Sequence, residues 1–154
     1  MVPQRMPLAP FEKFTLRSSG GMPSPENPAS TCKPDLYGET FTVDAQALTF
    51  EWNYCRHDFG SSLSTINKGS RALTSDELTR VRDAFDKLTI GSRGSCGADK
   101  PLVTVSVQHP GSETASVYVD EFNFCQPPQP GQTYIMNIDA LTDALNGLAT
   151  KSAQ

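Results

Sequence analysis

The sequence lacks several features that would place it in a well-defined functional class. It has no apolar run long enough to span a bilayer, no closely spaced cysteine pair of the kind that holds structural zinc, and no nucleophile-elbow motif. Its 13 basic and 17 acidic residues are too evenly balanced for phosphate binding, which needs clustered Lys and Arg. We therefore expect no enzymatic activity, no metal or other cofactor, no nucleic-acid partner and no transmembrane segment.

What the sequence does contain is four cysteines near the boundaries between expected strands and loops. Cys55 and Cys125 end two strand-like runs, and Cys32 and Cys96 lie in loops rich in Gly, Pro and Ser. An even number of cysteines predicts two disulfides; of the three possible connectivities we favour Cys32–Cys55 with Cys96–Cys125, because each is local. Disulfides persist in oxidising compartments. The chain is therefore predicted to be secreted or periplasmic, and a membrane tether through a removed N-terminal segment would fit that location.

Alternating apolar residues and helix signals predict the order strand, hairpin, helix, hairpin, helix. We expect a flexible N-terminal segment over 1–10 and a single α+β domain over 11–150. The clearest strand is 48–54, where Phe50, Trp52 and Tyr54 share one parity and are expected in the core. Residues 56–72 are expected to form a polar loop. The predicted fold is an antiparallel sheet of about five strands (β-ββ-α-ββ-α) with both helices packed on one face.

Two helices are indicated by their capping residues and apolar stripes. Thr74 and Glu77 fit a capping box, in which the Thr hydroxyl and the Glu carboxylate satisfy each other's backbone N–H groups. Asn137 is the expected N-cap of the last helix. The predicted buried stripe of the first helix consists of Leu78, Val81, Phe85 and Leu88.

Three other groups of residues could carry chemistry, but each has a simpler structural explanation. Cys55, His57 and Asp58 are close in sequence, yet a disulfide followed by a polar turn explains them better than a nucleophile and its base. Asp120 and Glu121 are adjacent, and neighbours in a strand point to opposite faces unless a bulge intervenes. His109 precedes Pro110 in an expected hairpin turn, where a solvated side chain is the simplest expectation.

The strongest candidate for function is the loop that follows the first expected strand. It contains Ser19, Gly20, Gly21, Met22 and Pro23, which we take as the candidate binding residues. The glycines permit unusual backbone angles, and Pro23 stiffens the chain beside an apolar Met. A loop held by a rigid scaffold is a common way to present a binding surface. The whole loop, 18–31, is therefore predicted to contact another protein.

The element order and the motif Ser19-Gly20-Gly21-Met22 resemble the emfourin type of bacterial metallopeptidase inhibitor, whose members carry a Ser-Gly-Gly-Phe-like loop after the first strand. The resemblance implies a peptidase as partner. The four cysteines and the longer Pro-rich loop depart from that pattern. The chain is also similar to uncharacterised exported or lipid-anchored proteins of Gram-negative bacteria. A structural or lipoprotein-like envelope component without inhibitory activity is therefore the alternative hypothesis.

Overall fold

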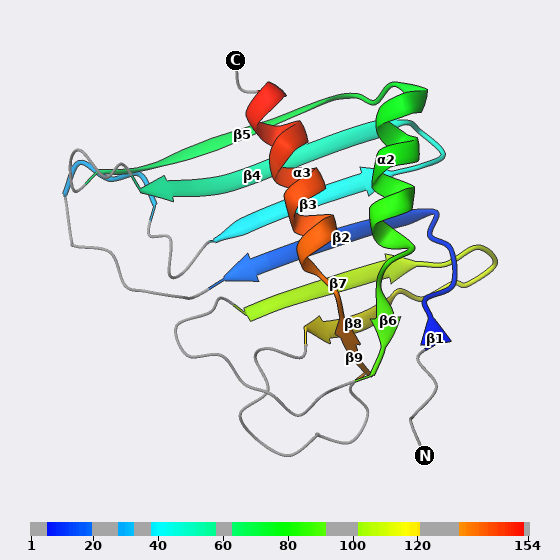
Figure 1. Ribbon diagram of the computed structural model, residues 1–154. Coiled ribbons are helices and arrows are strands. Elements are labelled where there is room, and N and C mark those ends of the chain that lie inside the picture. The colour runs from blue at the N-terminus through cyan, green and yellow to red at the C-terminus, as the bar shows by residue number, and fades with distance from the viewer. Residues whose placement is uncertain are drawn as a thin grey trace.

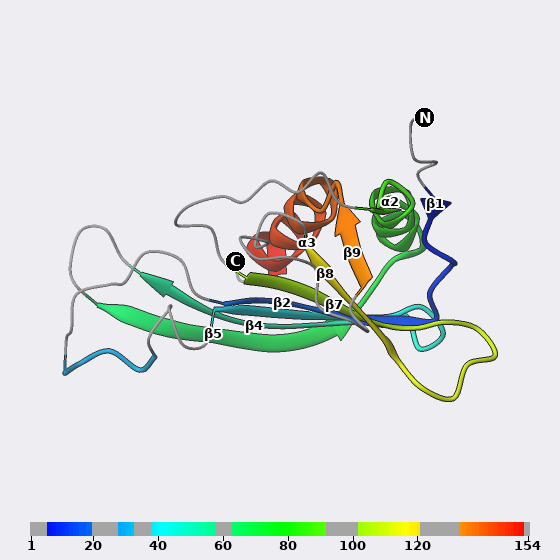
Figure 2. The same cartoon turned by 90° about the horizontal axis from the view of Figure 1, so that it is seen from below.

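The computed structural model describes residues 6–19, 28–32, 38–57, 63–91, 102–120 and 133–152. These residues form one sheet with two helices on one of its faces (Figure 1, Figure 2). The strands are β1 (Met6–Pro7), β2 (Lys13–Ser19), β3 (Glu39–Asp44), β4 (Thr49–His57), β5 (Ser64–Ala72), β6 (Thr89–Ile90), β7 (Leu102–Gln108), β8 (Ser116–Asp120) and β9 (Thr133–Met136), and the helices are α2 (Ser75–Phe85) and α3 (Asp139–Ser152). The α+β class and the placement of both helices on one face are confirmed.

The prediction of about five antiparallel strands is wrong. Within the described residues the sheet has nine strands in the order β1-β6-β9-β8-β7-β2-β3-β4-β5, and β8 pairs with β9 in parallel. Three of the additional strands are short, and β5 replaces much of the polar loop expected over 56–72. Parallel pairing needs a long connection, which hides it from any local sequence pattern.

The hydrophobic core lies between the sheet and the two helices. Phe14, Phe41 and Phe50 lie on the same face of the neighbouring strands β2, β3 and β4 and are almost completely buried. The predicted stripe of α2 is buried against this layer, as are Leu141 and Leu145 of α3. Burying a side chain of this size contributes roughly 1.5–3 kcal/mol. The core therefore holds the strands in register, which fixes where each loop leaves the sheet.

Neither α2 nor α3 lies on the opposite face of the sheet (Figure 2), and the described side chains on that face are mainly polar. The hydroxyls of Thr15 and Thr42 lie 3.0 Å apart on this face, and Glu51 and Lys68 are exposed there. The alternation of apolar and hydroxyl-bearing residues along β2 and β3 produces this division, since successive side chains point to opposite faces.

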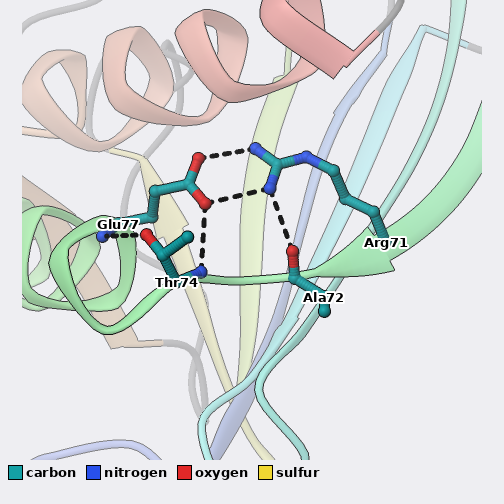
Figure 3. Close-up of polar contacts among 4 residues, drawn as sticks. All are labelled: Arg71, Ala72, Thr74 and Glu77. Atoms are coloured by element: carbon teal, nitrogen blue, oxygen red, sulfur yellow. Dashed lines mark hydrogen bonds and ion pairs between the residues drawn. The ribbon is translucent and has the colours of Figure 1, made fainter.

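A network of charge and capping contacts joins β5 to α2 (Figure 3). The Arg71 guanidinium donates to Glu77 Oε1 at 2.9 Å and to Oε2 at 2.7 Å, and Thr74 N–H donates to Oε1 at 3.0 Å. Glu77 N–H donates in turn to Thr74 Oγ1 at 3.2 Å, so the predicted capping box is confirmed. The hydrogen bond from Arg71 lowers the pKa of Glu77 to about 2.

Candidate functional site

The disulfide Cys32–Cys55 lies at the end of the sheet where β2 ends, β3 begins, β4 ends and β5 begins. Its Cα atoms are 6.0 Å apart and both cysteines are buried. The predicted pairing of these two cysteines is confirmed. Cys96 and Cys125, the second predicted pair, lie outside the described residues. The disulfide joins the segment before β3 to the C-terminal part of β4.

The segment just before Cys32 is also hydrogen bonded to the outer strand of the sheet. Thr31 N–H donates to the Ser64 carbonyl at 2.9 Å, and Ser64 N–H donates to Ser30 Oγ at 2.8 Å. Ile66 N–H donates to Thr31 Oγ1 at 3.0 Å. We call residues 30–32, with their three hydrogen bonds and the disulfide, the clip. The clip fastens the C-terminal end of the 18–31 loop to the start of β5.

The N-terminal end of the same loop is held in the middle of the sheet. Ser18 lies between Glu39 of β3 and Val103 of β7 and is buried, and Ser19 is the last residue of β2, opposite Leu102. Gly20, Gly21, Met22 and Pro23 lie outside the described residues. Of the five predicted binding residues, the structure therefore places only Ser19. The two fixed ends of the loop are separated by β3 and β4 in the sheet order.

The other candidate groups do not come together as a catalytic site. Cys55 is held in the disulfide and cannot act as a nucleophile, and His57 ends β4 opposite Ser64. Asp58 and Glu121 lie outside the described residues, whereas Asp120 is buried at the end of β8 beside Ile135. Among the residues that the structure describes, no three His, Cys, Asp or Glu side chains are grouped so that they could hold a metal ion.

His109 has a structural role that sequence reasoning missed. Its Nδ1 lies 2.8 Å from the Pro10 carbonyl oxygen and its Nε2 lies 2.8 Å from the Tyr118 hydroxyl. A carbonyl only accepts, so Nδ1–H donates to Pro10 and Nε2 accepts from Tyr118 in the neutral ring. His109 and Pro10 are 99 positions apart in sequence, and no local pattern connects them.

An open cleft lies at the opposite end of the sheet from the clip. It has a volume of about 420 Å³ and is lined mainly by Pro10, Phe11, Ala45, Arg82, Asp86 and Pro110. Arg82 and Asp86 are exposed at its margin. The cleft therefore offers an apolar floor with a solvated rim, and it contains none of the residues predicted to bind a partner.

Comparison with protein families, with curated proteins and with solved structures finds no match for this chain. Within the described part, no helix is both long and apolar enough to cross a membrane. Function is therefore assigned from the geometry of the chain itself.

Proposed function

We propose that this chain is an exported protein-binding domain that presents the loop of residues 18–31 to another protein. The observation that carries this proposal is the fixation of both loop ends. One end continues from β2, which has a hydrogen-bonded neighbour on each side, and the other is held by the clip.

Fixed loop ends favour binding for an entropic reason. Ordering a residue's backbone costs about 1–2 kcal/mol, and an interface must offset that cost for every residue it orders. The strand on one side and the clip on the other order residues 18–19 and 30–32 before any partner arrives. An interface that uses this loop therefore does not have to offset the cost of ordering these residues.

The disulfide supports the exported location. A cross-link between Cys32 and Cys55 would be reduced by the thiol systems of a cytosol, whereas it persists in a secreted or periplasmic protein. The buried position of both cysteines further protects the bond from exchange with external thiols.

The sharpest form of the proposal is inhibition of a bacterial metallopeptidase. Its support is the Ser-Gly-Gly-Met motif at positions 19–22, directly after the strand that anchors the loop. In this arrangement Met22 is the apolar anchor that enters a pocket of the peptidase, and Pro23 limits the backbone freedom beside it.

The test is a titration of a panel of bacterial metallopeptidases with the wild-type chain, Met22→Asp and Leu48→Asp. We expect Met22→Asp to abolish inhibition, because a carboxylate would have to be desolvated in an apolar pocket. Leu48→Asp is the matched control: it too replaces an apolar residue by Asp, and Leu48 is exposed at the opposite end of the sheet. It should inhibit as strongly as wild type.

Two outcomes would reject parts of the proposal. Absence of inhibition by the wild-type chain across the peptidases would reject the inhibitor assignment. Equal inhibition by wild type and Met22→Asp would reject the loop as the contact surface. Circular dichroism of both variants, expected to match wild type, separates these results from unfolding.

A further inference from the structure

The two edges of the nine-stranded sheet differ in how they are protected. β1 forms one edge; it has two residues, and one of them is Pro7, whose nitrogen carries no hydrogen to donate. β5 forms the other edge, with nine residues, no proline and an unbroken register against β4 (Figure 1). A long, regular edge strand is a template for pairing with a further strand.

Hydrogen bonds in the structure show which backbone groups of β5 point away from β4. Ser64 and Ile66 bond to the clip, so their N–H and carbonyl groups face outward. Leu73 N–H bonds to the Leu48 carbonyl and therefore faces β4. Because successive residues of a strand alternate, Lys68, Ser70 and Ala72 also face outward.

Some of these outward groups are already occupied, and the remainder form a symmetrical set. The clip is hydrogen bonded to the N–H and the carbonyl of Ser64 and to the N–H of Ile66. Arg71 Nη1 donates to the Ala72 carbonyl at 2.9 Å. Within the described residues, the groups left open are the Ile66 carbonyl, both groups of Lys68 and Ser70, and the Ala72 N–H. This set is symmetrical about Gly69: for each open N–H on one side of Gly69, an open carbonyl lies at the same distance on the other side.

We propose that the edge pairs with β5 of a second copy of this chain, antiparallel about a two-fold axis at Gly69. In this register Lys68 lies opposite Ser70 of the second copy, and Ile66 lies opposite Ala72 of the second copy. Lys68 and Ser70 exchange both of their bonds across the interface. The Ile66 carbonyl accepts from Ala72 N–H, so every open group meets a complementary one.

Other registers leave groups unmatched. Pairing Lys68 directly with Lys68 of the second copy would set like charges opposite each other. It would also aim the Ser70 carbonyl at an Ile66 N–H that already donates to Thr31. A shift in the other direction would aim the Lys68 N–H at the Ala72 carbonyl, which Arg71 already occupies. The register about Gly69 is therefore the one that the open groups select.

The side chains on the polar face complement the same register. Glu51 of β4 is paired with Ser70 of β5. In the proposed register, Ser70 is paired on its other side with Lys68 of the second copy. Glu51, Ser70 and this Lys68 therefore form one row across three neighbouring strands. Neighbouring strands are about 4.8 Å apart, and the long Lys and Glu side chains can meet over the small Ser. Glu51 and Lys68 are both exposed, and they line a hollow on this face together with Thr40, Thr42, Asn53 and Ser70. Ile66, 42% exposed, would pack on Ala72 of the second copy.

Sedimentation equilibrium of the full chain over a concentration series tests this proposal. We expect a monomer–dimer equilibrium for wild type. Ser70→Pro removes an outward N–H from each copy without touching the β4 ladder, and should raise the dimer Kd about 100-fold or more. Ser70→Ala is the matched control, since it keeps the N–H, and should dimerise as wild type does. A wild type that remains monomeric throughout, or a Ser70→Pro variant with unchanged Kd, would overturn the proposal.

A charge exchange tests the register independently of any effect of proline on folding. Lys68→Glu and Glu51→Lys should each raise the dimer Kd, about tenfold, because each places like charges in one row across the interface. The double variant restores opposite charges and should recover the wild-type Kd. A double variant as weak as the single variants would overturn the proposed register. The peptidase titration does not depend on either result, so the two proposals fail separately.

Discussion

Replacing Glu77 by Gln removes the charge from the network that joins β5 to α2 while keeping the shape of the side chain. The Glu77 side chain is 9% exposed and that of Arg71 is 26% exposed, so the variant leaves a partly desolvated guanidinium without its counter-ion. The pKa of Glu77 falls from 4.5 to about 2, chiefly through the hydrogen bond from Arg71. At about 1.4 kcal/mol per pKa unit, and discounted for the exposure of Arg71, the charge contributes about 2 kcal/mol to the free energy of unfolding.

The sign of the pH dependence follows from the lowered pKa. A carboxyl group whose pKa is lower in the folded state stabilises the fold fully above its unfolded pKa of about 4.5, and loses that contribution as the pH falls toward 2. Glu77→Gln should therefore be less stable than wild type by about 2 kcal/mol at pH 7. The difference should shrink below pH 4.5 and become small near pH 2, because about half of the wild-type carboxyl groups are then protonated.

Urea unfolding at several pH values between neutral and acid measures this difference directly. Asp76→Asn is the matched control: it removes the same charge from the same first turn of α2 at an exposed position, where no ion pair with Arg71 exists. It should cost less than about 1 kcal/mol, the usual size of a helix-dipole contribution. A Glu77→Gln penalty equal to that of Asp76→Asn, or one that does not change with pH, would refute the reasoning.

Three further stability predictions follow from the described contacts. Replacing Cys32 and Cys55 by Ser should lower the free energy of unfolding by about 3 kcal/mol, from the chain-entropy estimate for a loop of this length; an unchanged urea midpoint would contradict it. Leu48 has a φ of 54°, in the left-handed region that Asn adopts more readily than Leu. Leu48→Asn should therefore raise the free energy of unfolding by about 0.5–1 kcal/mol, and the Tm with it. A lower Tm would contradict the turn geometry. A Cβ on Gly69 would lie 2.5 Å from the Trp52 ring. Gly69→Ala should therefore cost about 1–3 kcal/mol and shift the emission of the single tryptophan; unchanged emission and stability would show that the ring does not cover Gly69.

The central strands could be predicted from the sequence, whereas the edge strand β5 could not. β3 and β4 alternate apolar and polar residues because one of their faces is buried and the other is not. β5 carries no such alternation, because its core-facing positions are occupied by Asn67, Gly69 and Arg71. Trp52 lies over Gly69 and donates to Asn67 Oδ1 at 2.9 Å, so a neighbouring strand supplies the apolar cover for β5.

Two other parts of the structure do not follow the local sequence signals. Asn137 was the expected N-cap of the last helix, but α3 begins at Asp139 and Asn137 has a φ of 70°. Its side-chain amide donates instead to the Lys87 carbonyl at 3.3 Å, a contact across 50 positions of sequence. On β8, Val117 is 58% exposed while Asp120 is buried, the reverse of what hydrophobicity alone predicts.

The disulfide of the candidate site could be predicted from the sequence, whereas the hydrogen bonds of the site could not. The local spacing of Cys32 and Cys55 was enough to favour their pairing, because each lies where a loop meets a strand. The bonds of Ser30 and Thr31 to β5 involve the edge of a strand that the sequence did not reveal, so the clip as a whole could not be anticipated.

Intact mass of the purified chain before and after reduction, followed by peptide mapping without reduction, tests the central claim that a disulfide clip fastens the 18–31 loop. The account predicts a linked peptide pair that contains Cys32 and Cys55, and a mass that increases on reduction by the hydrogens added to the cysteines. Free thiols at both positions, with the mass unchanged by reduction, would contradict the clip and remove the main support for an exported protein.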